Sequence, residues 1–283
     1  MTRRMLITGG AGYLGAELAH QANAQGWHVT TTVFRQPAAH PTIPQIPLDI
    51  RDAAAVERAF QEVQPNVVVH TAYRQNGPDL WSTCATGAAV VARAARDVNA
   101  RLIHLSSDAI FDGTREGAYT EDDPPSPITP YGEAKAAAEG MVAEILPTSV
   151  IVRTSLLYGG SRLGTHEQLI LDVADGRADL TFFTDEIRCP ITVDDLAAAL
   201  LEVANLDYSG ILHIAGPEPI SRYDFARLIA AAHGRSPEVL RAGLSSESGL
   251  RRPRHCTLDI SRAQRLLHTR LRGVSDVLGA SIG

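Results

Sequence analysis

The sequence predicts an α/β fold in which a doubly wound parallel sheet carries a smaller C-terminal lobe. Strand-like and helix-like segments alternate through the first 155 residues, an order typical of parallel sheets with helices on both faces. A glycine-rich turn, within LITGGAGYLG at 6–15, follows the first of these strands. After Ser155 the alternation loosens, and glycines and charged residues fill 159–179. These observations indicate a sheet domain and a second, less regular lobe.

The elements of the sheet domain follow from local sequence signals. Apolar and β-branched runs predict strands, and longer segments rich in helix-forming residues predict helices. The expected strands are 4–8, 27–35, 66–72, 101–107 and 149–155, and the expected helices are 13–26, 53–63, 83–98 and 129–146. The last helix has the clearest ends, because Thr129 can cap it, Pro130 suits its first position and Pro147 stops it.

The C-terminal part predicts fewer elements. The expected ones are a strand at 180–183, a helix at 191–205 capped by an aspartate, a strand at 210–216 and a helix at 221–234. From this pattern we assign residues 1–156 and about 180–206 to the sheet domain. We assign about 157–179 and 207–283 to the smaller lobe, which would bind the substrate.

Composition limits the classes of function. The chain has 283 residues and a net charge of −6, so no basic excess is present to bind nucleic acid. Cys84, Cys189 and Cys256 are far apart and no HExxH occurs, so neither a disulfide nor a metal site is expected. No apolar stretch reaches membrane-spanning length, and the apolar run at the N-terminus is too short for a signal peptide. We therefore expect a cytoplasmic protein without nucleic-acid, membrane or metal partners.

The glycine turn predicts a dinucleotide site. Gly10, Gly12 and Gly15 satisfy GxGxxG, and Gly9 with Gly12 and Gly15 satisfies GxxGxxG. Such a turn lets backbone N–H groups and a helix N-terminus approach a pyrophosphate, which a Cβ would block. The turn follows a strand and precedes a helix, which is the context found in the Rossmann fold.

The end of the second strand bears on the choice of cofactor. An acidic residue there would bind the ribose of NAD(H), whereas an arginine suits the 2′-phosphate of NADP(H). The strand at 27–35 ends in Arg35 with no acid nearby, so NADP(H) is favoured and NAD(H) stays open. After the third strand, Asp49 could bond the adenine amine and Ile50 could pack on its ring.

Lys135 is the single lysine among the 26 lysines and arginines, and it lies four residues after Tyr131. Both side chains share one face of the helix at 129–146. A nearby ammonium would lower the pKa of the phenol, which is ordinarily about 10. Tyr131 could then protonate the alkoxide formed when a hydride reduces a carbonyl, while Lys135 could also reach ribose hydroxyls of the cofactor. A solvent-facing pair is the alternative interpretation.

Three motifs in this order, TGGAGYLG at 8–15, LSSD at 105–108 and YGEAK at 131–135, resemble the extended short-chain dehydrogenase/reductases. Within that family, the stretch 105–135 looks like the dTDP-4-dehydrorhamnose reductase branch. The resemblance implies Ser107, Tyr131 and Lys135 as catalytic residues, with Ser107 bonding the substrate carbonyl and Asp108 beside it at the substrate. The cofactor-binding residues would be Gly9, Gly12, Tyr13, Leu14, Gly15, Arg35, Asp49, Ile50, Thr71, Ala72 and Tyr73, together with Tyr131 and Lys135.

Two positions depart from the family pattern. Cys84, in CATG, aligns with an asparagine that orders water and backbone. Leu156 aligns with a tryptophan expected to contact the sugar, and leucine cannot stack on a sugar ring in the same way. Leu156 is still expected at the substrate, and Arg188, Arg252 or Arg254 could grip a diphosphate there, although each could equally be a solvated surface residue.

Three functions are compatible with these features. The first is NAD(P)H-dependent reduction of a keto group on a nucleotide-linked 4-keto sugar. The second is a binding subunit, since the regulatory subunit of methionine adenosyltransferase is similar through the SSD and YxxxK motifs and also lacks the tryptophan. The third is a sugar-nucleotide epimerase, whereas a dehydratase is disfavoured because Asp108 is followed by Ala109 rather than a glutamate. The resemblance is also compatible with a homodimer.

Overall fold

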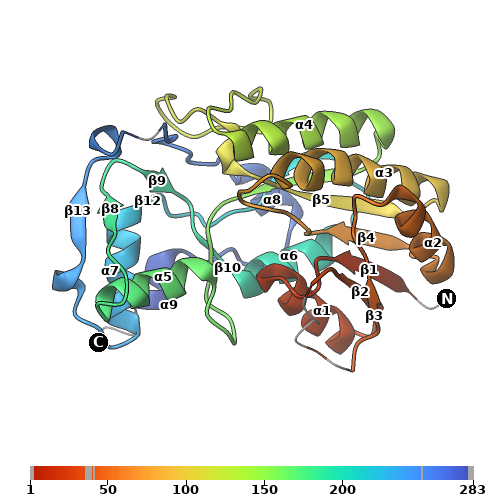
Figure 1. Cartoon of the computed structure of the whole chain (residues 1–283), viewed down its shortest axis with the longest axis horizontal. Helices are drawn as coiled ribbons and strands as arrows, with labels where there is room; N and C mark the ends of the chain where they lie inside the picture. Colours follow the sequence, from red (N-terminus) through yellow and green to blue (C-terminus); the bar gives the residue numbers. More distant parts are fainter. Residues whose placement is uncertain (1–2, 36–39, 41, 250, 280–283) are drawn as a thin grey trace.

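A computed structural model describes residues 3–35, 40, 42–249 and 251–279 of the chain. Its centre is a seven-stranded sheet in the order β11-β6-β5-β4-β1-β2-β3, and every pairing in it is parallel. The strands are β1 (Arg4–Thr8), β2 (His28–Val33), β3 (Gln45–Pro47), β4 (Val67–His70), β5 (Arg101–Ser107), β6 (Val150–Thr154) and β11 (Gly210–His213). Helices cover both faces of the sheet (Figure 1). The predicted doubly wound Rossmann fold is confirmed.

Alternating side chains give each face of the sheet its own core. On β1, Met5 and Ile7 point into one core, and Leu6 points into the other. The helices of the first core are α1 (Tyr13–Ala24) and α6 (Val193–Val203), and those of the second are α2 (Ala53–Val63), α3 (Gly87–Asp97) and α4 (Pro130–Ile145). The carboxyl ends of the parallel strands meet at one edge, which is where such sheets bind ligands.

Helix α4 begins where its sequence signals predicted, whereas the N-termini of α3 and α6 differ from our predictions. Thr129 Oγ1 accepts a hydrogen bond from Gly132 N at 3.1 Å, and α4 begins at Pro130. The helix expected at 83–98 starts with a π-helical turn, Ser82–Thr86, and continues as α3. The aspartate cap expected for α6 is wrong, because Thr192 Oγ1 accepts from Asp195 N at 3.1 Å. Threonine is also a suitable cap, and Asp194 and Asp195 lie in the first turn of the helix, where their charge is stabilised by the helix dipole.

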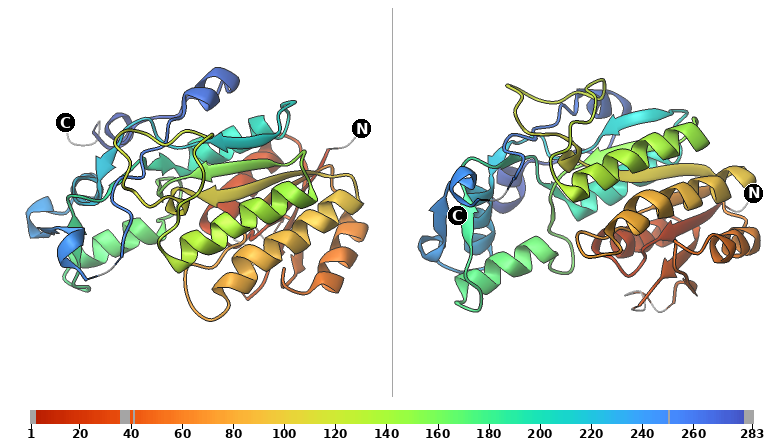
Figure 2. Two further views of the ribbon diagram at one scale, coloured as in Figure 1. Left: turned by 90° about the horizontal axis from the view of Figure 1, so that it is seen from above. Right: turned by 45° about the horizontal axis from the view of Figure 1, so that its top comes forward.

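The second lobe lies beside the carboxyl edge of the sheet (Figures 1 and 2). Its helices are α5 (Thr165–Ala174), α7 (Arg222–Ala232) and α9 (Val274–Leu278), and its strands are β8 (Thr181–Phe183), β9 (Ile187–Arg188), β12 (Ile220–Ser221) and β13 (Arg241–Gly243). Its own core includes Phe182, Phe225 and Leu240. A short parallel pair, β7 (Leu157–Tyr158) with β10 (Ile191–Thr192), lies where the chain passes between the two lobes.

The boundary of the second lobe differs from the one that we assigned from the sequence. The strand β11 pairs with β6 at the edge of the main sheet. The helix α8 (Ser261–Leu266) contributes Ala263 to the first core, and Leu258 and Leu271 also join that core. Residues 210–213 and much of 256–271 therefore belong with the sheet domain, because their apolar side chains are buried there.

Candidate active site

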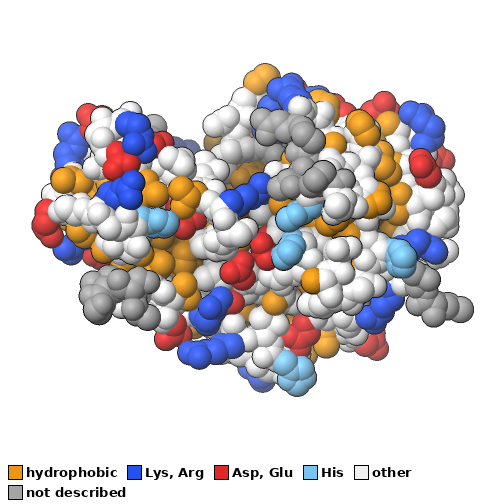
Figure 3. Space-filling model, turned by 90° about the horizontal axis from the view of Figure 1, so that it is seen from below, with side chains coloured by type: hydrophobic (Ala, Val, Ile, Leu, Met, Phe, Trp, Pro, Cys, Tyr) orange, Lys and Arg blue, Asp and Glu red, His pale blue; other side chains and the backbone are white. Residues whose placement is uncertain are grey.

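A cleft of about 1040 Å³ runs from the glycine turn, past Tyr131, to the second lobe. Figure 3 shows the surface hollowed between the two lobes. Thirteen residues that we predicted for the site line this cleft: Gly12, Tyr13, Leu14, Gly15, Thr71, Tyr73, Ser107, Asp108, Tyr131, Lys135, Leu156, Arg188 and Arg252. The structure thus brings together residues from both lobes that are up to 240 positions apart, the separation of Gly12 and Arg252.

The glycine turn is shaped by close packing within the protein. Gly9 has a φ of +76°, a left-handed conformation that favours glycine, and a Cβ there would lie 2.9 Å from Ala72 Cα. A Cβ on Gly15 would collide with the Gly9 carbonyl. Gly12 N–H donates to Gly9 O at 2.8 Å, and Gly12 precedes α1 without a capping side chain. The N-terminus of α1 is therefore open toward the cleft, which suits a pyrophosphate.

The residues expected at the adenosine end lie outside the lining of this cleft. Arg35 is exposed, with its guanidinium carbon 5.2 Å from the centroid of the Phe34 ring. Asp49 is paired with Arg51 at 2.6 Å, and Arg51 also reaches Asp79 at 2.8 Å. Arg51 was not predicted for the site, although it lies two positions after Asp49. Its charge is already used by two carboxylates, whereas Arg35 has no ion pair among the described residues.

Ile50, Gly9 and Ala72, which we also predicted to bind the cofactor, do not line the cleft. Ile50 is 5% exposed and packs in the second core, with its side chain against the start of α3 at Gly87. Ala72 N donates a hydrogen bond to Thr8 Oγ1 at 3.4 Å. These residues pack within the protein next to the glycine turn and to the start of α3.

Tyr131 and Ser107 form the centre of the candidate site. A hydrogen bond to Ser107 lowers the pKa of Tyr131, but burial, together with Tyr73, Cys84 and Asp108, raises that pKa well above its ordinary value. The rings of Tyr73 and Tyr131 lie 6.2 Å apart, edge to face. Tyr73 is exposed, with 57% of its surface accessible, so it forms the outer wall of the cleft beside Tyr131.

Lys135 does not have the effect that we expected from the sequence. Lys135 is 4% exposed, and its ammonium donates to the Leu105 carbonyl oxygen. Burial lowers the pKa of Lys135, and burial is also the largest cause of the raised pKa of Tyr131. The expected lowering of the tyrosine pKa by the neighbouring ammonium is therefore not found: the pKa of Tyr131 is set by burial first, then by Tyr73, Cys84, Asp108 and Ser107.

Cys84 occupies the position of the family's asparagine and bonds the backbone of the loop after β4. Its Sγ donates to Arg74 O at 3.2 Å and accepts from Arg74 N at 3.3 Å. It also packs with Leu80, Ala134 and Tyr131 in a small apolar cluster. The thiol thus supplies both a donor and an acceptor to the backbone, which is part of the role that the resemblance gives to asparagine.

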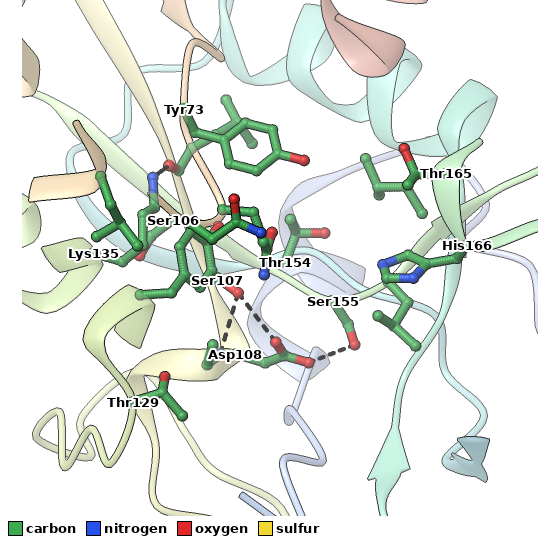
Figure 4. Close-up of a pocket in the computed structure, with 18 of the residues that line it drawn as sticks. Tyr73, Ser106, Ser107, Asp108, Thr129, Lys135, Thr154, Ser155, Thr165 and His166 are labelled. Atoms are coloured by element: carbon green, nitrogen blue, oxygen red, sulfur yellow. Dashed lines mark hydrogen bonds between the residues drawn. The ribbon is translucent and has the colours of Figure 1, made fainter. Parts of the chain in front are cut away.

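Asp108 lies between two hydroxyls in the floor of the cleft, as Figure 4 shows. Its Oδ2 accepts from Ser155 Oγ at 2.6 Å, and its Oδ1 accepts from Ser107 Oγ at 3.2 Å. Arg188 Nε lies 3.7 Å from Oδ2. Burial raises the pKa of Asp108, while Arg188, Ser155 and Ser107 oppose that shift. Ser155 was not predicted for the site; its signal is its place directly after β6, at the carboxyl edge of the sheet.

Two of the three arginines that could have gripped a diphosphate, Arg188 and Arg252, are engaged within the protein. Arg188 is 6% exposed and donates to the carbonyls of Ile187, Pro253 and Arg254 at 2.7, 2.7 and 3.1 Å. Arg252 donates to Glu186 at 2.8 Å. Arg254 is exposed and does not line the cleft, so its contribution is the carbonyl that holds Arg188. Arg188 thereby ties the segment at 251–254 to the floor of the site.

Within the described ranges, no group of three or more histidine, cysteine or acidic side chains is arranged to hold a metal ion. In that same part of the chain, no helix has the length and apolar character needed to cross a membrane.

A Rossmann sheet with a serine at its carboxyl edge, a tyrosine and a lysine on a neighbouring helix, and a second lobe beside them defines an extended short-chain dehydrogenase/reductase. The family model described as the RmlD substrate binding domain matches residues 3–282, and the chain belongs to this family. The predicted family and fold are confirmed. The expected class, an oxidoreductase of the dTDP-4-dehydrorhamnose reductase type, is likewise confirmed by the family and its reductase relatives.

Two kinds of curated relative are similar to the chain over most of its length. The dTDP-4-dehydrorhamnose reductase of Mycobacterium tuberculosis is 31% identical, over 93% of this chain and 86% of the relative. The methionine adenosyltransferase 2 subunit beta of Rattus norvegicus is also 31% identical, over 94% of this chain and 83% of the relative.

Solved structures share the fold at lower identity. A dTDP-4-dehydrorhamnose reductase from Bacillus anthracis, in complex with NADP, superposes with a TM-score of 0.85 at 24% identity, covering 99% of this chain and 98% of the other. WbmG of Bordetella bronchiseptica, in complex with NAD and UDP, gives a TM-score of 0.82 at 21% identity, covering 99% and 95%.

Proposed function

We propose that the protein reduces a keto group with NADPH, and that its substrate is a nucleotide-linked 4-keto sugar. The observation that carries this proposal is that Ser107, Tyr131 and Lys135 line the same cleft as the glycine turn. A substrate bound in this cleft would therefore lie close both to the proton donor, Tyr131, and to a cofactor held by the glycine turn. The reductase relative from Mycobacterium tuberculosis supports the same reaction class.

The residues of the cleft fit a dinucleotide. The uncapped N-terminus of α1 lies at one end, and no Cβ of Gly12 or Gly15 obstructs it. Lys135 and Tyr131 lie further along the cleft, where they would meet the nicotinamide ribose. Arg35, exposed at the end of β2 and free of ion pairs among the described residues, favours NADP(H), and NAD(H) stays open.

The proposed mechanism uses the ionisation state of Tyr131. Because burial raises the pKa of Tyr131 well above its ordinary value, the phenol is protonated at neutral pH and can act as the acid. When bound, NADPH supplies a hydride to the carbonyl carbon. Tyr131 donates its proton to the carbonyl oxygen as negative charge develops there, and Ser107 Oγ bonds the same oxygen. Lys135, one helical turn away, would bond the ribose hydroxyls of the bound cofactor.

A second candidate is an NADP-binding subunit of another enzyme, favoured by the 31% identity to methionine adenosyltransferase 2 subunit beta. Leu156 in place of tryptophan suits this candidate as well, since the side chain is partly buried against the core of the second lobe. An epimerase remains a further alternative and would use the same tyrosine.

Incubation with NADPH and a panel of 4-keto sugar nucleotides distinguishes these functions. Loss of absorbance at the reduced-nicotinamide band, dependent on the keto sugar, is expected of the reductase. Tight NADPH binding without turnover on any member of the panel would contradict the reductase and favour the binding subunit. Cofactor released on denaturation provides the test for an epimerase, which would retain NAD. The three cysteines are all free and buried, and we include a cytoplasmic location, with its reducing environment, in the proposal.

A further inference from the structure

Two side chains of the second lobe face the cleft without partners. Arg222, the first residue of α7, and His166, in the first turn of α5, both line it. In Figure 4 the His166 ring points into the pocket from the side opposite Lys135. Neither the guanidinium of Arg222 nor the imidazole of His166 makes a hydrogen bond or an ion pair within the part of the chain that the structure describes. Sequence reasoning identified neither residue.

The other arginines of this part of the cleft differ from Arg222. Arg188 uses its donors on three carbonyls and on Glu186, and Arg252 is paired with Glu186 at 2.8 Å. Glu186 is 4% exposed and already serves these two arginines. Arg222 therefore has only the longer-range attraction of Glu186 and Asp108, and its own N–H groups stay available to a ligand.

The charges around Arg222 leave a positive excess. Four arginines, Arg188, Arg222, Arg251 and Arg252, line this part of the cleft against two carboxylates, those of Asp108 and Glu186. Burial, with the nearby Arg188 and Arg252, lowers the pKa of Arg222 to about 10. Burial and Arg222 likewise lower the pKa of His166 to about 4. A bound anion would relieve the repulsion at both side chains.

We propose that Arg222 and His166 form an oxyanion subsite, which holds a phosphoryl or carboxylate group of the substrate at the second-lobe end of the cleft. The inference rests on the proposed function for its substrate class and deepens it, because it replaces Arg188 and Arg252 as the gripping residues. The Arg222 guanidinium supplies charge and two parallel N–H donors, and the neutral His166 ring supplies one more N–H. The two sources of the oxyanion are a nucleoside diphosphate and a sugar acid.

The test is a calorimetric titration of the NADP⁺-loaded protein with UDP, with dTDP and, separately, with glucuronate. The variants are Arg222→Met and His166→Gln. We expect Arg222→Met to weaken binding of the nucleoside diphosphates by about tenfold to a hundredfold, because one charge-assisted pair is lost. His166→Gln should weaken it several-fold. Binding of glucuronate in place of the diphosphates, with the same dependence on Arg222, would support the subsite and identify the anion as a carboxylate.

Arg227→Met is the matched control. Arg227 lies on the same helix as Arg222, faces Tyr223 and pairs with Glu238 outside the cleft. The Arg227→Met variant should bind every ligand with the same affinity as the wild type. Equal affinity of wild type and Arg222→Met for the ligand that binds would overturn the inference, as would no binding of any of the three ligands to the wild type. Since no turnover is needed, a protein that binds UDP through Arg222 but reduces no keto sugar would contradict the proposed function alone.

Discussion

Ser155 Oγ donates a 2.6 Å hydrogen bond to Asp108 Oδ2 and accepts one from Cys189 N at 3.2 Å. The bond to Asp108 joins the carboxyl ends of two neighbouring strands, β5 and β6. Because the other carboxylate oxygen accepts from Ser107, Ser155 indirectly fixes the hydroxyl that would bond the substrate carbonyl. Ser155 is thus a positioning residue for Ser107.

Replacing Ser155 by alanine should therefore lower kcat about tenfold and leave the KM for NADPH unchanged. A change of about 1.4 kcal/mol, the ordinary worth of one such hydrogen bond, gives that factor. Steady-state kinetics on the keto substrate measure it. Ser155→Thr, which keeps the hydroxyl, should recover most of the activity, and equal losses in both variants would show that the hydroxyl has no positioning role.

Replacing Tyr131 by phenylalanine should remove turnover while keeping NADPH affinity nearly intact, since only the hydroxyl is lost. We expect kcat to fall by at least about a hundredfold, the range for loss of a general acid. Stopped-flow hydride transfer and fluorescence titration with NADPH give the two quantities. Tyr73→Phe is the matched control, because Tyr73 lies beside Tyr131 but contributes the outer wall. Full activity of the Tyr131 variant would exclude this residue as the proton donor.

Arg35→Gln should weaken NADPH binding about tenfold or more and change NADH binding little. The guanidinium would pair only with the 2′-phosphate, and a charge-assisted hydrogen bond is worth about 1.5–3 kcal/mol. Competitive titrations with the two cofactors measure the ratio. Arg58→Gln, exposed on α2, serves as the control for net charge. An equal loss of affinity for NADPH and NADH would instead indicate that Arg35 supports the loop and does not select between the two cofactors.

His213 makes the folded state sensitive to acid. Burial and Arg153 lower the pKa of His213 to about 4, so the unfolded chain takes up a proton below its ordinary pKa of about 6.5 while the folded chain does not. The free energy of unfolding should consequently fall as the pH falls through the window between these two values. The share of His213 in that loss is about 2 kcal/mol between pH 7 and pH 5.

Urea denaturation at the two pH values tests this share. His213→Gln keeps an acceptor for Arg153 but cannot titrate, so its free energy of unfolding should decline by about 2 kcal/mol less than that of the wild type. His28→Gln, on the exposed end of β2, should behave as the wild type does. Parallel curves for the wild type and His213→Gln would remove His213 as a source of the acid sensitivity.

The sequence predicts well those features that depend on neighbouring residues. The glycine turn, the cap at Thr129 and the placement of Tyr131 and Lys135 on one helix, α4, are of this kind, since each is set within a few positions. The features that we could not predict from the sequence depend on packing between residues far apart in the chain. The engagement of Arg188 depends on carbonyls at 253 and 254, about 65 positions away, and no local pattern marks it.

The subsite residues illustrate the same limit. Arg222 and His166 become neighbours only because α5 and α7 share the core of the second lobe. In sequence they are separated by 56 positions and belong to no common motif. Similarly, nothing local to 210–213 reveals that this strand joins the main sheet, because its partner β6 lies some 60 residues earlier.

The return of α6 and β11 to the sheet has a consequence for synthesis of the protein. When a ribosome has released only the first 156 residues, the face of the sheet that includes Met5 and Ile7 has α1 but lacks α6, and β6 lacks β11 on its outer side. The nascent chain would carry an apolar surface and an unpaired strand edge until about 213 residues have emerged. Truncated forms ending near residue 156 should therefore aggregate, and chaperones would engage the growing polypeptide during that interval.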